Sequence, residues 1–170
     1  MSGHVQLAQS SALHQGAENL LTKALDALAK DQPERAQALV RRALRIPFDE
    51  YEESSPAWWQ AYFMVFMAIT DEAEDGPGDQ AWLDAALQVE EQATGHGRDA
   101  VRLCLEVMDH DYELNAGDSR LIRSRIGKPR QLRDWQDLLP EDDDAAVTAI
   151  LQVLAAYNAY DDALDAACDS

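Results

Sequence analysis

Three aspartates, Asp161, Asp162 and Asp165, have a spacing that could hold a divalent metal ion. Residues four apart lie on the same face of an α-helix, so two of these carboxylates would lie side by side. Mg²⁺ takes oxygen ligands and is commonly bound by one or two carboxylates together with phosphate oxygens of a substrate. The motif therefore predicts, as one alternative, a magnesium-dependent helical enzyme.

This DDxxD motif resembles that of the all-helical prenyl synthases, and the resemblance implies the diphosphate substrate. No second acidic motif is available to face the first, and 170 residues are few for the large helical bundle of that family. We therefore do not expect these aspartates to form a magnesium site. We predict no metal site, no cofactor and no catalytic residue.

Other stretches contain residue types that bind metal ions or catalyse reactions, but each of these motifs is incomplete. The run 71–79 resembles an EF-hand loop with Gly76 at its sixth position, but its third and twelfth positions are Ala73 and Trp82, so two calcium ligands are missing. His110 lies among acids without a second histidine three or four residues away. No serine lies in a GxSxG context, and no glycine-rich phosphate-binding motif occurs. These absences favour a non-enzymatic protein.

The charge of the chain is strongly negative, with 32 acidic and 14 basic residues and a net charge of −18. Such a field repels nucleic acid and anionic membranes, so we expect no direct binding to either. Six basic residues nevertheless lie close together in the sequence, and we call them the basic cluster: Arg120, Arg123, Arg125, Lys128, Arg130 and Arg133. They either neutralise acidic faces of the same protein or bind an anion or a protein partner.

The cellular compartment is predicted from three features. The most apolar segment, 57–70, is 14 residues long, whereas a membrane span needs about 20. No secretory signal is evident at the N-terminus. Cys104 and Cys168 are far apart and form neither a zinc motif nor a disulfide framework, and Cys104 falls in an apolar helical stripe. We expect a cytoplasmic protein.

Apolar residues recur three and four positions apart almost throughout the chain, which predicts helices rather than strands. We predict an all-α fold of six to seven helices in antiparallel hairpins, with a flexible N-terminus at 1–10 and a single helical domain at 11–167. Turn residues place the main helices at 11–30, 32–46, 56–73, 79–94, 99–110 and from 140 onward. Between them we expect a short helix at 131–139 and one or two helical turns around Leu121 to Ile126.

The helix at 56–73 is apolar around most of its circumference, which is typical of a central helix. Phe63 is then expected to be a core residue, and Phe63→Ala should cost about 3–5 kcal/mol. An aromatic-rich groove for a partner is the alternative explanation of the same pattern.

The segment 20–47 resembles one tetratricopeptide-type helical hairpin. The resemblance rests on Ala24 and Leu28 in the first helix, an acidic turn at 31–34, and Val40, Ala43 and Leu44 in the second helix. It departs from the family at Lys23 and at Pro47, and it covers 28 of 170 residues. What it implies is a helical scaffold of the kind that binds protein partners.

The leading function hypothesis is therefore a non-enzymatic helical scaffold that binds another protein, with a homodimer as one form of that interaction. An acidic regulator that mimics nucleic acid and occupies a basic partner is a second hypothesis, based on the net charge of −18.

Overall fold

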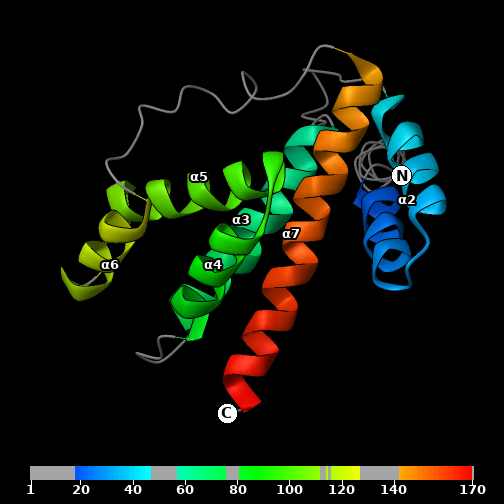
Figure 1. The fold of residues 1–170 in the computed structure, drawn as a ribbon. Helices are drawn as coiled ribbons and strands as arrows, with labels where there is room; N and C mark the ends of the chain where they lie inside the picture. The colour runs from blue at the N-terminus through cyan, green and yellow to red at the C-terminus, as the bar shows by residue number, and fades with distance from the viewer. Residues whose placement is uncertain are drawn as a thin grey trace, which may run out of the picture.

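The computed structural model describes residues 18–46, 57–75, 81–111, 114, 116–126 and 142–169 (Figure 1). Helix 18–29 is followed by α2 (Pro33–Leu44), α3 (Ala57–Asp75), α4 (Ala81–Gln92), α5 (Gly95–Asp111), α6 (Ala116–Ile126) and α7 (Asp143–Asp169). This part of the chain contains no strand, so the predicted all-α class is confirmed. The expected flexible segment 1–10 and the expected helix 131–139 lie outside the described residues. None of the described helices has the length and apolar character of a membrane span.

The turn between helix 18–29 and α2 is closed by the backbone. Asp31 adopts the left-handed conformation with φ 56°, and the Asp31 and Gln32 N–H groups donate to Leu28 O and Ala27 O at 3.1 and 2.8 Å. This is the Schellman arrangement that ends many helices, with aspartate where glycine is usual. Pro33 then begins α2, where its missing N–H costs nothing. The turn brings the two helices back against each other.

Helix α7 lies between this N-terminal pair and the other helices, and it packs against α2, α3, α4 and α5 (Figure 1). Each of the seven described helices contributes fully buried side chains to one continuous core: Leu21, Val40, Val65, Leu83, Met108, Ile122 and Leu154. Asn158 of α7 donates to Leu25 O at 3.1 Å, and Arg41 of α2 pairs with Asp144 at 2.6 Å. These contacts attach the N-terminal pair to α7.

Helix α3 also packs against four helices, α2, α4, α5 and α7, but some of its apolar side chains are exposed. Ala61, Tyr62, Val65 and Ile69 are buried, whereas Phe63 is 42% exposed and Met67 is 38% exposed. The expectation that Phe63 is a core residue is therefore wrong. A helix that is apolar all round is buried only where neighbouring segments cover it, and the four neighbouring helices leave Phe63 and Met67 partly exposed.

Helices α5 and α7 approach each other closely at the start of α5. A Cβ atom on Gly97 would lie 2.4 Å from the backbone oxygen of Gln152 in α7. The side-chain oxygen of Gln152 accepts a hydrogen bond from the His96 N–H at 3.0 Å. The sequence places a break at 95–97, but the helix begins at Gly95, so Gly97 is a helical contact residue rather than a loop residue.

Candidate functional site

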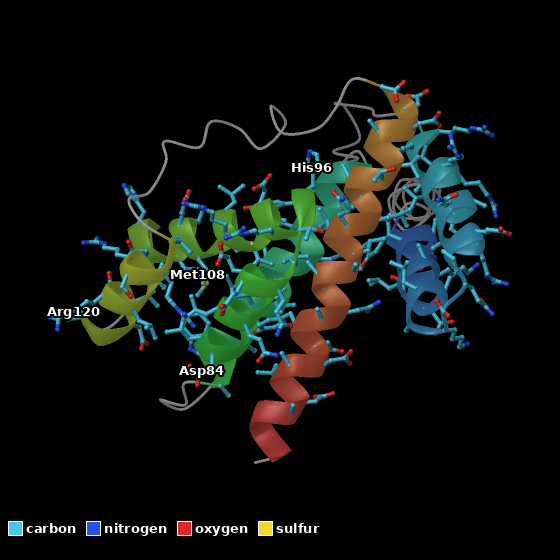
Figure 2. The ribbon with its side chains drawn as sticks, in the orientation of Figure 1. Asp84, His96, Met108 and Arg120 are labelled. Carbon is cyan, nitrogen blue, oxygen red and sulfur yellow. The ribbon has the colours of Figure 1, made fainter. Side chains whose placement is uncertain are left out.

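The basic cluster lies partly on α6, at an edge of the molecule (Figure 2). Arg120, Arg123 and Arg125 are exposed on this helix, which contacts α4 and α5. The other three members, Lys128, Arg130 and Arg133, lie outside the described residues. The structure therefore describes three of the six residues of the basic cluster.

Arg123 belongs to a hydrogen-bonded group that joins α6 to α5. Its Nε lies 2.9 Å from Oδ2 of Asp109, and the Ser119 hydroxyl donates to the other oxygen of the same carboxylate. The Asp109 side chain is only 3% exposed, although Arg123 itself is 63% exposed. Burial raises the pKa of Asp109, but the hydrogen bonds from Ser119 and Arg123 outweigh burial, so its pKa is below the ordinary value. Asp109 is thus a structural carboxylate that joins α5 to α6.

We expect Asp109→Asn to lower the free energy of unfolding by about 1–3 kcal/mol at pH 7, because the buried group loses its charged acceptor. The pKa is lower in the folded protein than in the unfolded chain. The Asp109 contribution is therefore complete above the unfolded pKa of about 3.9 and is lost as the pH falls through the folded pKa. Urea unfolding of both proteins at pH 7 and at about pH 3 measures this change.

The matched control is Asp84→Asn, because Asp84 is exposed on α4, and it should change stability by no more than about 0.5 kcal/mol. A difference between wild type and Asp109→Asn that stays constant from neutral to acidic pH would contradict the assignment of Asp109.

Arg125 forms a longer pair with Glu91 of α4 at 3.8 Å, and both side chains are more than half exposed. Such a pair contributes about 0–1 kcal/mol. Two of the three described arginines are therefore directed toward acids of the same chain, which supports internal charge balance for Arg123 and Arg125.

The three aspartates of the DDxxD motif are exposed on α7, near its end. Partial burial and the carboxylates of Asp165 and Asp162 raise the pKa of Asp161. In the part of the chain that the structure describes, no group of three or more histidine, cysteine, aspartate or glutamate residues is arranged to hold a metal ion. The side chains of the EF-hand-like run 71–79 lie outside the described residues.

Cys104 is fully buried on α5, where the apolar stripe of the sequence places it. Burial raises the pKa of its thiol well above the ordinary value, and a hydrogen bond with Tyr62 offsets this only in part. Because the thiolate is the nucleophilic form, the buried thiol is inert at neutral pH.

One side of α3 carries a stripe of partly exposed side chains that we call the α3 apolar face: Phe63, Phe66 and Met67. The Phe63 and Phe66 rings are stacked with centroids 6.3 Å apart and an interplanar angle of 28°. Phe66 is half-buried and stacks in turn on the buried Tyr62 at 6.2 Å. Spacings of three and four residues place the stripe on one helix face. In the sequence this face is indicated only by the number of apolar residues in 56–73, which is larger than a single buried helix face needs.

Comparisons of the chain with protein-family models, with curated proteins and with solved structures find no match.

Proposed function

We propose that this protein is a non-enzymatic helical module that binds another protein. The observation that carries the proposal is the α3 apolar face, where Phe63 and Met67 are exposed next to each other. Contiguous exposed apolar side chains often mark interaction sites, whereas single ones are normal on any surface. Burial of this face by a partner would add the hydrophobic stabilisation that the isolated chain forgoes.

The placement of the reactive groups also supports a binding role. Cys104 is buried with a raised pKa, and Asp109 is held by Ser119 and Arg123. Among the described residues these groups serve packing and helix contacts. The tetratricopeptide-like hairpin at 20–47 stays a prediction in the same direction, because such hairpins are used as scaffolds for partners.

The acidic regulator is a second candidate, favoured by the net charge of −18. A complex held mainly by charge weakens steeply between low and moderate salt, since exposed charges are screened beyond about 10 Å at 0.1 M. A complex that buries the α3 apolar face should lose little affinity over the same range. The salt dependence of partner binding therefore separates the two functions.

Affinity purification from the cells that carry the gene tests the proposal. The wild type is compared with Phe63→Ser/Met67→Ser and with the control Gln88→Ser/Gln92→Ser, which changes two exposed uncharged residues four apart on α4. We expect a protein that co-purifies in a stoichiometric amount with the wild type and the control and is lost from the α3 variant. Absence of any such protein would contradict the proposed function.

A further inference from the structure

Three arginines of α2 have no ion-pair partner, although the chain is rich in acids. Every side chain of this helix is described, and Arg35, Arg42 and Arg45 are exposed. None of the ion pairs in the described part of the chain includes any of them. The fourth arginine of the helix, Arg41, pairs with Asp144 at 2.6 Å. Among the described residues, the charges of the other three are therefore uncompensated.

The three arginines lie along one side of α2, and we call them the α2 arginine stripe. They are seven and three residues apart, which is about two turns and one turn of a helix. Arg45 follows the last helical residue and keeps helical backbone angles, so the stripe spans about 15 Å. The exposed Ala38 lies between Arg35 and Arg42 on the same side, and its small side chain leaves the guanidinium groups accessible. The helix itself lies at the edge of the molecule opposite α6 (Figure 1).

The stability of α2 explains only part of this stripe. A cation near the C-terminal end of a helix interacts favourably with the helix dipole, which accounts for Arg42 and Arg45. Arg35 lies in the first turn, where the same dipole makes a cation unfavourable. Arg42 and Arg45 are also neighbours on the helix surface, and like charges in such positions destabilise a helix. A ligand explains the whole stripe better than the helix does.

The chemistry and the length of the stripe indicate a short anionic ligand. Arginine binds carboxylates and phosphates through paired hydrogen bonds. DNA carries one charge per about 1.7 Å and would extend past the stripe, where a chain with a net charge of −18 repels it. A short acidic segment avoids most of this repulsion, because exposed charges more than about 10 Å away are screened at 0.1 M salt. The favoured ligand is therefore a protein segment that carries several carboxylates.

We propose that the α2 arginine stripe binds a short acidic segment of a partner protein. The carboxylates of that segment accept hydrogen bonds from Arg35, Arg42 and Arg45. Exposed ion pairs contribute little each and are screened by salt, so the complex is weak, transient and salt-dependent. The stripe includes no residue of the α3 apolar face, so this interaction is additional to the proposed function.

The test is an NMR titration of the full chain, in which the shifts of the backbone amides give both the affinity and the place of binding. One peptide of about 12 residues, which is as long as the stripe when helical, consists half of glutamate and half of alanine. The second peptide has glutamine at every glutamate position. Each is added to the wild type and to Arg35→Gln/Arg42→Gln/Arg45→Gln at about 50 and about 150 mM salt. Circular dichroism establishes that each protein is folded.

The matched control is Lys23→Gln/Lys30→Gln/Arg120→Gln. It removes the same three positive charges, and all three side chains are exposed and lie outside α2. Lys30 pairs only with Asp26, one turn away, and both side chains are 63% exposed, so the loss of this pair changes stability little. The control also tests Arg120 of the basic cluster as a rival site for the acidic peptide.

We expect the glutamate peptide to bind the wild type and the control at least about five-fold more tightly than it binds the stripe variant. The largest shifts should lie in 33–45, they should weaken at the higher salt, and the glutamine peptide should cause none. An unchanged affinity of the stripe variant would overturn the inference. So would a loss of binding in the control, because the peptide would then be held outside α2.

Two further measurements test the choice of partner. If an oligothymidylate of the same length binds the wild type more tightly than the glutamate peptide does, the ligand is a nucleic acid and the inference is wrong. If sedimentation shows that the wild type self-associates and the stripe variant does not, the stripe binds a second copy of this chain, and the inference is again wrong. A monomeric wild type that prefers the peptide supports it.

Discussion

Gly97→Ala is expected to lower the free energy of unfolding by about 2 kcal/mol. The added Cβ would lie 2.4 Å from Gln152 O, 3.0 Å from Gln152 C and 3.3 Å from the Ala156 Cβ. Two of these atoms are backbone of α7 and do not rotate away, so α5 and α7 must separate. Overpacking of this kind costs about 1–3 kcal/mol, and we take the upper end. The better helix propensity of alanine offsets about 1 kcal/mol of it.

Gly117→Ala is the matched control, because Gly117 is exposed in the first turn of α6. The same chemical change there should be neutral or stabilise the protein by up to about 1 kcal/mol. Urea unfolding of the two variants measures whether each is less or more stable than the wild type. If Gly97→Ala were as stable as Gly117→Ala, the close approach of α5 and α7 would be wrong.

Leu154→Ala is expected to lower the free energy of unfolding by about 3–5 kcal/mol, more than Gly97→Ala. Leu154 is fully buried on α7, the helix that packs against α2, α3, α4 and α5. The substitution removes buried side-chain atoms and leaves a cavity. Because four neighbouring helices hold α7 in place, the cavity collapses little, so we expect a loss in the upper part of the usual range for leucine-to-alanine substitutions. Thermal and urea unfolding provide the two measurements of stability.

Leu151→Ala, one turn away on the same helix, is the control for Leu154→Ala. Leu151 is half-buried, so its truncation exposes less new cavity and should cost clearly less, about 1–2 kcal/mol. Equal losses for the two leucines would contradict the position of α7 between the other helices.

The helical class and several helix limits could be predicted because they depend on local signals. The periodic apolar residues of 32–46 and the Pro33 start correspond to α2 at Pro33–Leu44.

The start of α5 could not be predicted from such local signals. Gly95 and Gly97 have the appearance of a helix break, and their role depends on Gln152, more than 50 residues later in the chain. Ala116 and Gly117, which favour a turn locally, likewise begin α6.

The candidate surfaces were predictable only as sets of residues. The sequence contains so many acids that the partner of Arg123 could not be chosen, and folding selects Asp109 by bringing α5 against α6. For α3, the apolar pattern predicts burial but does not say which of its apolar side chains stay exposed. The exposure of Phe63 is a property of the whole arrangement, so it required the structure.

The most direct test of the α3 apolar face is the free energy of unfolding of Phe63→Ser/Met67→Ser relative to the wild type. The two side chains are 42% and 38% exposed, so the account predicts a combined loss of no more than about 2 kcal/mol, with full helix content retained. A loss of about 5 kcal/mol or more, which two buried side chains of these types would give, would show that the residues belong to the core and would contradict the account.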